Sequence, residues 1–315
     1  MNNAPKAGIV VVGSLNADLT IYTERLPQPG ETVHGNGFAV NPGGKSANQA
    51  VAASRLGGKV SLIGAVGEDP NGTMLLDSTA NAGVDVSRVR RTGIATGVAV
   101  ISVDANGENS IIISAGANGT LSPADVDAAA FRDAAVVCLC LEVGIDTVVA
   151  AAQAGHDAGA TVLLNLSPYA EVPEVLAGLS DVLLVNAHEA ALFLGDGADI
   201  PDADAPADHW EPVRSRFAHR GLQRVLVTLG SQGSVVLDSL ADKQVTRIAP
   251  TRVSAVDTTG AGDAFTGAVA ARLAAGDSLT DAASFASVAA ALAATKKGTQ
   301  AAYATFGEVE AARAS

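Results

Sequence analysis

The strongest constraint on the fold is a recurring pattern of short, continuously apolar segments. They are rich in Val, Ile and Leu and read "IVVVGS", "VSLIGAVG", "VVCLCLEV", "TVLLNLS", "DVLLVN" and "RVLVTLG". Strands buried on both faces form uninterrupted apolar runs, whereas half-exposed strands alternate apolar and polar residues. These segments therefore predict the strands of a parallel sheet that is covered on both faces.

Alanine-rich segments with helical spacing lie between these strands, among them "SANQAVAASRLG", "GTMLLDSTANAG" and "DTVVAAAQAGHDAG". Strands that alternate with helices indicate βαβ units. A chain of 315 residues suits one large domain with an elaboration. We predict an α/β fold with a doubly wound, mostly parallel central sheet flanked by helices.

Two regions interrupt this alternation. The first, residues 14–42, contains the Pro- and Gly-rich stretch "LPQPGETVHGNGFAVN". In the second, residues 95–118, "GVAVISV" and "NSIIIS" flank the turn-rich "DANGE", which is a hairpin signal. We expect these regions to form a small β-sheet lid, with residues 1–13, 43–94 and 119–315 forming the α/β domain.

The charge balance limits the partners of this chain. It has 20 Lys and Arg against 33 Asp and Glu, a formal net charge of −13. Such a chain repels nucleic acid and anionic membranes, so we expect neither as a partner. Any phosphate must then be held locally, by backbone N–H groups, bound cations or single basic side chains.

Apolar runs are too short for a membrane span of about 18 residues. The N-terminal "MNNAPKAG" lacks the long apolar stretch of a signal peptide. We therefore expect a soluble, cytoplasmic protein.

The two cysteines, Cys138 and Cys140, lie on one face of a predicted strand. They could form a redox pair or half of a metal site. Free cysteine is usually a small buried residue, and we favour two buried thiols in a reduced protein.

Residues 196–209 carry five Asp and two Pro. A carboxylate cluster of this kind could bind a divalent metal, but it lacks the Gly and terminal Glu spacing of a calcium loop. We favour a solvated loop, because this composition cannot bury a core.

The segment "VDTTGAGDAFTGA" reads as a strand that gives way to a helix. We expect the strand to end near Val256 and Thr258 or Thr259 to cap the helix. The helix should bury one face, because apolar residues recur every four positions at Phe265, Val269 and Leu273.

The start of this helix is a candidate site for an anion. Gly260 and Gly262 let the backbone turn sharply and let a ligand approach. The N–H groups of Gly260, Ala261, Gly262 and Asp263 lack helical partners and, with the helix dipole, attract an anion. The sequence also places the Asp263 carboxylate there.

Two anionic groups fit one site if the carboxylate takes a proton from a hydroxyl that attacks a bound phosphoryl group. The pattern thus indicates phosphoryl transfer, with Asp263 as general base. The alternative is an ordinary helix start, where Asp is favourable to the dipole. A dinucleotide fingerprint is excluded, because Phe265 stands where GxGxxG needs Gly.

The stretch "AVNPGGKSANQAVAASRLG" nearly matches the phosphate-binding P-loop pattern GxxxxGK[ST]. Ala39 replaces its first Gly, and a Pro/Gly turn precedes it instead of a buried strand. We favour another role, in which Gly43, Gly44 and the following helix start line a pocket. Lys45 and Asn48 would offer hydrogen-bond donors to a hydroxyl-rich ligand there.

Polar residues also follow two of the predicted strands. In "GSLNADL", Asn16 and Asp18 stand just past the first strand, at the edge where open α/β sheets bind ligands. An ionised Asp accepts two hydrogen bonds from a vicinal diol. Taken alone, this segment also fits a polar turn. Glu142 ends another apolar strand, either at the same site or as a plain strand-end carboxylate.

Together, these motifs resemble the ribokinase-like (PfkB-type) family of carbohydrate kinases. "VDTTGAGDAFTGA" resembles the family signature, and further motifs follow in family order: "GSLNADL", "NPGGKSANQAVAASRLG", "GEDPNG", "DANGENSIIISAGAN", "NAHEAALFLG" and "VTLGSQGSVVLD". The resemblance covers about residues 8–300. It implies a central sheet that binds nucleotide and sugar, and a β lid that covers the sugar and often forms a homodimer contact.

The implied activity is ATP-dependent phosphorylation of D-ribose at O5, with Mg²⁺. Asp263 matches the general base, and Gly260, Ala261 and Gly262 match the anion hole for the γ-phosphate. The implied sugar-binding positions are Asn16, Ala17, Asp18, Gly44, Lys45, Ser46, Ala47, Asn48, Glu142 and Asp263. The implied ATP-binding positions are Asn186, Thr228, Leu229, Gly230, Ser231, Gln232, Gly233, Gly262, Asp263 and Ser287.

The resemblance also implies two cations. Asn186 and Glu189 match positions near magnesium and the phosphates, although Glu189 by itself reads as a first-turn carboxylate of a helix. The potassium positions are Asp257, Thr259, Ala293, Lys296 and Gly298.

The chain departs from the family pattern at three of these positions. Ala302 replaces a Ser of the potassium motif, so one side-chain ligand of the cation is missing. Ser46 replaces a Gly, and its hydroxyl could contact the sugar or narrow the pocket. Ser287 stands where His or Asn is frequent near the adenine.

Several alternatives remain open from the sequence. The chain could be a kinase for another small sugar or for a nucleoside, although the lid offers only Tyr22 and Phe38 to a base. A non-catalytic sugar or nucleotide sensor would lack Asp263, which is present. A nicotinamide dehydrogenase is disfavoured by the missing GxGxxG after the first strand.

Overall fold

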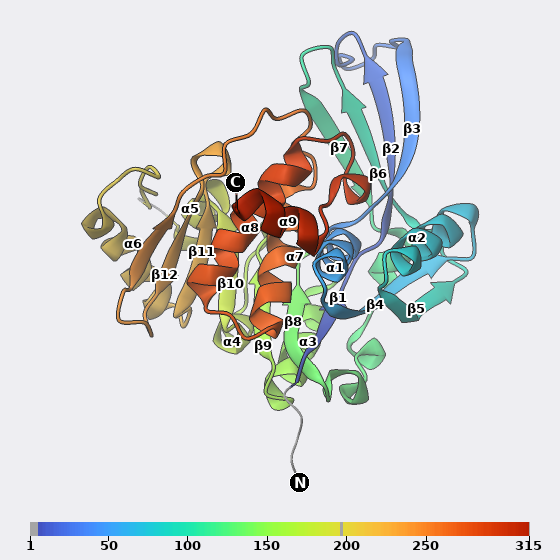
Figure 1. Ribbon diagram of the computed structural model, residues 1–315. Helices are drawn as coiled ribbons and strands as arrows, with labels where there is room; N and C mark the ends of the chain where they lie inside the picture. Colours follow the sequence, from blue (N-terminus) through green and yellow to red (C-terminus); the bar gives the residue numbers. More distant parts are fainter. Residues whose placement is uncertain (1–5, 196–197, 315) are drawn as a thin grey trace.

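The fold is given by a computed structural model that describes residues 6–195 and 198–314. The prediction that the N-terminal "MNNAPKAG" is not a signal peptide therefore concerns residues that lie mostly outside the described part. Residues 196 and 197 of the acidic stretch 196–209 also lie outside it. Within the described part, the chain forms a nine-stranded sheet between layers of helices and a four-stranded sheet that projects from one end (Figure 1).

The strands of the large sheet are β1 (Gly8–Val12), β4 (Lys59–Gly67), β5 (Asp85–Thr92), β8 (Ala134–Leu139), β9 (Thr161–Asn165), β10 (Val182–Asn186), β11 (Arg224–Thr228), β12 (Ser234–Asp238) and β13 (Val245–Ile248). The strands of the small sheet are β2 (Asn16–Thr23), β3 (Gly35–Gly43), β6 (Gly97–Val103) and β7 (Asn109–Ser114).

The helices are α1 (Lys45–Arg55), α2 (Pro70–Asn81), α3 (Ile145–Asp157), α4 (Glu174–Leu179), α5 (Ala187–Leu194), α6 (Ala207–His219), α7 (Ala261–Ala274), α8 (Leu279–Ala294) and α9 (Phe306–Arg313). Short 3₁₀ turns occur at η1 (Gly116–Thr120), η2 (Pro123–Asp125), η3 (Ala128–Phe131), η4 (Gly230–Gln232) and η5 (Gln300–Ala302). In the described residues, no helix is both long and apolar enough to cross a membrane.

The predicted fold class is confirmed. The apolar segments of the sequence become β1, β4, β8, β9, β10 and β11, which pair in parallel. The order across the sheet is β13-β12-β11-β10-β9-β8-β1-β4-β5, and only β12 and β13 join in antiparallel fashion. The Ala-rich segments become α1, α2 and α3.

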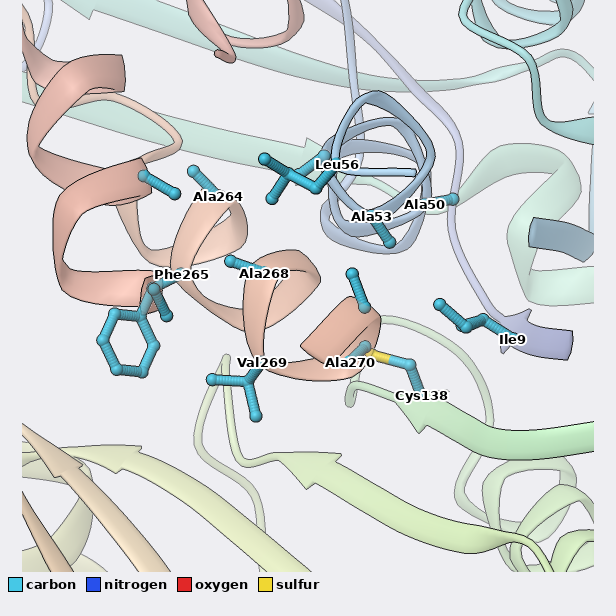
Figure 2. Close-up of a cluster of buried hydrophobic side chains, with 14 of the residues drawn as sticks. Ile9, Ala50, Ala53, Leu56, Cys138, Ala264, Phe265, Ala268, Val269 and Ala270 are labelled. Carbon is cyan, nitrogen blue, oxygen red and sulfur yellow. The ribbon is translucent and has the colours of Figure 1, made fainter. Parts of the chain in front are cut away.

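The continuous apolar runs are explained by two cores, one on each face of the large sheet. Successive residues of one strand enter different cores: Leu163 of β9 packs with helices α1, α7 and α8, and Leu164 with α3, α4 and α5. Figure 2 shows part of the first core, where Ile9 and Cys138 point from the sheet towards α1 and α7. Each fully buried aliphatic side chain contributes about 1.5–3 kcal/mol to folding.

Two local expectations before α7 were wrong. Residues 251–255 form no strand, and the N-cap of α7 is Gly260, with no side-chain cap from Thr258 or Thr259. Gly260 has φ 74°, a left-handed conformation that favours glycine. The chain therefore enters the helix through a glycine turn, which leaves the threonine side chains outside the capping position.

The strands β5, β12 and β13 were not predicted; β5 and β13 form the two edges of the large sheet, and β12 lies next to β13. The sequence of β5, "DVSRVRRT", is polar because this strand lies at the edge and is largely exposed. It does not read as the continuous apolar run that marks a central strand.

The small sheet follows directly from the C-terminal end of β1 and has the order β3-β2-β6-β7. Residues in register across its strands share a face, and alternate residues of a strand face opposite ways. Asp18, Thr20 and Tyr22 of β2 lie on one face. Ile21 and its partner Phe38 lie on the other.

Candidate active site

The site lies where the strand order of the large sheet reverses. From β1 the chain continues to β4 and β5 on one side, and later returns to β8 on the other. Open α/β sheets bind ligands beyond the carboxyl ends of strands at such a point. Here Ser14, after β1, donates a hydrogen bond from Oγ to Glu142 Oε2 at 2.5 Å, and Glu142 follows β8.

Helix α1 starts against the same carboxylate. The backbone N–H of Lys45, its first residue, donates to Glu142 Oε2 at 3.0 Å. A carboxylate at a helix N-terminus is favoured by the helix dipole. Gly44, the N-cap, has φ 90°, and a Cβ there would lie 2.7 Å from the backbone nitrogen of Asn16. The polar residues after β1, the start of α1 and Glu142 are thus held together.

Asn118 fixes the segment between the two sheets. Its Oδ1 accepts a hydrogen bond from the Leu15 N–H at 3.0 Å, and its Nδ2 donates to the Leu15 carbonyl and to Asn16 Oδ1 at 3.0 and 2.8 Å. Asn118 is buried and was not predicted as a site residue. The sequence motif "GAN" contained it, but its contacts join residues more than 100 positions apart.

Asp18 lies next to Gly43, where a Cβ would overlap the carboxylate. Burial raises the pKa of Asp18 to about 7, helped by the nearby negative charges of Glu142 and Asp263 and opposed by Lys45. The candidate sugar-binding acid is therefore part of a cluster of carboxylates around one lysine.

Lys45 provides the positive charge of this cluster. Burial alone would lower the pKa of its ammonium group, but the charges of Asp263 and Glu142 outweigh it and raise the pKa. The segment before α1 is β3, an antiparallel strand of the small sheet, so the buried parallel strand of a P-loop is absent at this point.

Asp263, in the first turn of α7, is 7% exposed. Its Oδ2 accepts a hydrogen bond from Asn48 Nδ2 and its Oδ1 one from Gln49 Nε2, both at 3.0 Å. Burial raises the pKa of Asp263, while Lys45 and the two amides act in the opposite direction. The polar end of α1 thus faces the start of α7.

The sequence predicted that the backbone N–H groups at the start of α7 lack hydrogen-bond partners, and this holds for only some of them. The Ala261 N–H donates to the Thr258 carbonyl at 3.1 Å, because the turn at Gly260 closes on itself. The N–H groups of Gly262 and Asp263 have no hydrogen-bond partner among the described residues. A Cβ on Gly260 would lie 2.6 Å from Thr299 Cγ2 and 2.8 Å from the Tyr303 hydroxyl.

Three candidate sugar-binding residues have side chains that turn away from this cluster. Ala17 is buried on the face of β2 opposite Asp18, and Ala47 packs in the core beneath α1. Ser46 is fully buried, with its hydroxyl 3.1 Å from Cys140 Sγ and against Gly13. The Ser46 hydroxyl therefore faces the sheet, and the suggested contact of this hydroxyl with a sugar is corrected.

Most of the candidate nucleotide residues, Asn186 and residues 228–233, lie at the ends of two neighbouring strands, β10 and β11. Asn186 of β10 pairs in register with Thr228 of β11. The next residues, Leu229 to Gly233, form a tight turn around η4, and Gly233 has φ 97°. Ser287 on α8 donates to the Ala249 carbonyl at 3.3 Å, beyond β13.

Glu189 forms a capping box with Asn186 at the start of α5. The Asn186 N–H donates to Glu189 Oε2 at 2.9 Å, and the Glu189 N–H donates to Asn186 Oδ1 at 2.8 Å. The first-turn carboxylate expected from the sequence is thus present. Of the two carboxylate oxygens of Glu189, the capping box uses Oε2.

Asp257 joins the two segments assigned to potassium. Its Oδ1 accepts from the Thr259 N–H at 2.9 Å and its Oδ2 from the Gly298 N–H at 3.0 Å. Although burial opposes it, these bonds lower the pKa of Asp257 below its usual range. The Ala293 carbonyl accepts from the Lys296 N–H at 3.3 Å. The Lys296 ammonium group points away, to Glu308.

Gln49 and Tyr303 are the further site residues that the sequence reasoning missed. Gln49 is fully buried beside Asn48, and the Tyr303 hydroxyl donates to the Gly260 carbonyl at 3.2 Å. A polar Gln in the apolar stripe of α1 was a usable signal for Gln49. We see no sequence signal for Tyr303, because its contact lies 43 residues away.

The class of the protein follows from comparison with known families. The model of pfkB family carbohydrate kinases matches residues 6–305. The chain is therefore a phosphotransferase with an alcohol acceptor. It belongs to the pfkB family of carbohydrate kinases.

Individual relatives agree with this assignment. The chain is 37% identical to a ribokinase of Schizosaccharomyces pombe and 36% identical to a deoxyribokinase of Salmonella typhi, over 92% and 94% of this chain and 92% and 95% of the relatives. Among solved structures, it is similar to the ribokinase of Arabidopsis thaliana complexed with ribose and ATP, with 31% identity and a TM-score of 0.88. That match covers 98% of this chain and 99% of the other.

Proposed function

We propose that the protein phosphorylates D-ribose at O5 with ATP, giving ribose 5-phosphate. Relatives named ribokinase and a similar structure that binds ribose and ATP support this substrate pair. The observation that carries the proposal is the position of Asp263, whose carboxylate lies at the glycine-marked start of α7 and contacts α1. An alcohol bound between these helices would meet a base and an anion site together.

In this mechanism Asp263 is the general base. Its raised pKa moves it towards the range in which a base is effective near neutral pH. Asp18, Lys45, Asn48 and Glu142 would orient the sugar hydroxyls, so that the primary hydroxyl points at Asp263. The Asp263 carboxylate then accepts the hydroxyl proton as the hydroxyl oxygen bonds to the γ-phosphorus, and the bond from the γ-phosphorus to the bridging oxygen breaks, so that ADP leaves.

The start of α7 would hold the transferred phosphoryl group. The Gly262 and Asp263 N–H groups and the helix dipole favour negative charge there. Because the Ala261 N–H is bonded to Thr258, we assign it a smaller part than the sequence suggested. Gly262 leaves the space beside these amides open, because a Cβ there would meet no atom within 4 Å.

ATP would lie along the ends of β10 and β11, over Thr228 and the turn that ends at Gly233. Asn186 and Glu189 stand beside that turn and would hold Mg²⁺ through water. Carboxylate and amide oxygens suit this ion, and Glu189 Oε1 accepts no hydrogen bond from a described residue. When bound, Mg²⁺ neutralises phosphate charge.

Potassium would bind between residues 257–259 and 293–298. An anionic Asp257 and main-chain carbonyls fit a monovalent cation. Ala302 is buried and offers no side-chain oxygen, so we propose weaker potassium activation than in relatives that carry Ser there.

The lid favours a small sugar over a nucleoside. Of its two aromatic residues, only Tyr22 lies on the face of Asp18, whereas Phe38 lies on the opposite face. A base would thus find one aromatic contact at most from the lid. The deoxyribokinase relative makes 2-deoxy-D-ribose the second candidate.

The first test is the variant Asp263→Asn together with a substrate panel. Asp263→Asn should abolish turnover while ATP binding stays nearly intact, measured by ADP release and by nucleotide titration. A near-wild-type rate would remove Asp263 as the base. The panel of ribose, 2-deoxyribose, hexoses and nucleosides should give the highest kcat/KM for ribose, and a preference for nucleosides would contradict the proposal.

The protein would form a homodimer through the lid. Exposed apolar residues share the face opposite Asp18: Ile21, Phe38, Val40, Val100 and Ile112. Apolar surface of this kind marks an interaction site. Phe38→Glu and Ile112→Glu should give monomers in light scattering, whereas Ile111→Glu on the other face of β7 should not. Monomeric wild-type protein would contradict this part.

A cytoplasmic location is the remaining part of the proposal. Cys138 and Cys140 are buried free thiols, which suits a reducing compartment. Cell fractionation with an activity assay tests it, and activity confined to an extracytoplasmic fraction would contradict it.

A further inference from the structure

Two carboxamides from adjacent positions of α1 hold the Asp263 carboxylate. Asn48 donates to Oδ2 and Gln49 to Oδ1, so each carboxylate oxygen receives one N–H at 3.0 Å. Asn48 is already a candidate for binding sugar. Gln49 is fully buried, and no part of the proposed reaction so far uses it.

The other end of Gln49 is held by a thiol. Cys138 Sγ donates to Gln49 Oε1 at 3.3 Å. Cys138 is fully buried on β8, and Figure 2 shows its side chain pointing from the sheet towards α7. Burial raises the pKa of this thiol, which therefore stays protonated and acts as a donor. With a donor on that side, the amide oxygen of Gln49 faces Cys138 and its nitrogen faces Asp263.

A second chain of hydrogen bonds reaches Asp263 through Asn48. Ser78 Oγ donates to Gln300 Oε1 at 3.2 Å, and Gln300 Nε2 donates to Asn48 Oδ1 at 3.0 Å. Reversing the Asn48 or the Gln49 side-chain amide would bring its oxygen against the Asp263 carboxylate. Both chains therefore deliver an N–H to Asp263, and each begins at an S–H or O–H donor.

We propose that Cys138 and Gln49 form a positioning pair that fixes the direction in which Asp263 presents its carboxylate to the sugar hydroxyl. This inference rests on the proposed function, in which Asp263 is the base. The χ2 torsion of an aspartate is broad, so packing alone leaves the carboxylate plane loosely defined. A donor on Oδ1 that is itself held in place restricts this rotation.

The pair acts on the chemical step and not on ligand binding. Neither residue is assigned to the sugar or the nucleotide, so their loss should lower kcat and leave both KM values nearly unchanged. Misdirected reacting groups cost up to about 100-fold in rate. A role in packing alone would lower the melting temperature without this separation of kcat from KM.

The test compares Cys138→Ser, Cys138→Ala and Cys138→Val. Serine keeps a donor but buries a more polar group, whereas alanine and valine keep an apolar site without a donor. Positioning predicts kcat near wild type for Cys138→Ser and about 10- to 100-fold lower for the other two. A role in packing alone predicts instead that Cys138→Ser has the lowest melting temperature of the three variants, because it buries a more polar group, and that its kcat is no higher than that of the other two. Cys140→Ala, two residues along the chain, is the matched control, because the Cys140 thiol lies against the Ser46 hydroxyl and takes no part in the hydrogen bonds of Gln49. This variant should stay within about twofold of wild type.

Gln49→Met supplies an independent variant of similar length. Gln49→Met should lower kcat as much as Cys138→Ala does. The double variant Cys138→Ala/Gln49→Met should be no slower than Gln49→Met, because both substitutions break the same chain of hydrogen bonds to Asp263. Wild-type kcat in Cys138→Ala and Cys138→Val, or additive losses in the double variant, would overturn the inference. If Asp263→Asn is inactive while the Cys138 variants behave as wild type, only the positioning pair fails; if Asp263→Asn is active, the base assignment fails.

Discussion

The Asp18 carboxylate lies directly against Gly43, so closely that a Cβ on Gly43 would overlap it. The two residues belong to neighbouring strands of the small sheet, β2 and β3. The absence of a side chain at position 43 therefore decides where the candidate sugar-binding acid can stand.

Gly43→Ala should displace Asp18 and raise the KM for ribose by about 10- to 100-fold, while the KM for ATP changes little. Gly307→Ala is the control, because a Cβ there meets no atom within 4 Å. Initial rates with each substrate varied in turn measure both constants. Equal increases in the two KM values would place the sugar elsewhere.

Asp18→Asn should change how stability depends on pH. The folded-state pKa of about 7 lies above the ordinary value of 3.8, so the folded state binds an extra proton between these values. Wild-type stability therefore falls as the pH rises from about 4 to 7. Asp18→Asn removes this loss and should raise the free energy of unfolding by about 1–3 kcal/mol at pH 8, and by less at pH 5. Urea unfolding at both pH values checks this, and an equal gain at both would contradict it.

Lys45→Met should act on the sugar side of the reaction. The Lys45 charge lowers the pKa of both Asp18 and Asp263, so its removal lets both pKa values rise. The acid limb of kcat/KM for ribose should then move to higher pH, because the base must be ionised. A pH profile of the variant measures this. A selective loss of ATP affinity would instead revive the P-loop interpretation.

Gly260→Ala should lower kcat by about 100-fold. The new Cβ would press on Thr299 and Tyr303, and φ 74° is unfavourable for alanine, so the start of α7 must shift. Gly276→Ala, just past the other end of α7, is the matched control: its φ is also positive, at 94°, but a Cβ there meets open space. Both variants should lose stability in thermal unfolding, but only Gly260→Ala should lose activity.

Ala302→Ser should strengthen potassium activation. The added hydroxyl restores the side-chain oxygen that the family resemblance assigns to the cation site. One hydrogen-bond-like contact with the cation corresponds to an about tenfold lower half-activating potassium concentration. Rates in KCl, with total ionic strength held by NaCl, measure it. Ala301→Ser, at an exposed neighbouring position, should change nothing. An unchanged response in Ala302→Ser would remove residue 302 from the cation site.

The central fold was predictable because it depends on local patterns. Strands such as β9, which send Leu163 and Leu164 into different cores, must be apolar throughout, and this signal survives without any tertiary information. Edge strands such as β5 carry no such signal, since one side of the ladder and much of each face meet water.

The sequence by itself determined the alternation of strands and helices, the glycine-marked start of α7 and the acid within it. These features follow from burial and from backbone conformation at single positions. Tertiary structure alone decided which groups meet Asp263: Asn48 and Gln49 lie more than 200 residues away in the chain, and Cys138 acts through Gln49. Tertiary structure also decided that the Ser46 hydroxyl faces the sheet and that the Ala261 N–H donates to the Thr258 carbonyl within a turn. Hydrogen bonds form between groups that packing brings together, and no local pattern encodes that distance.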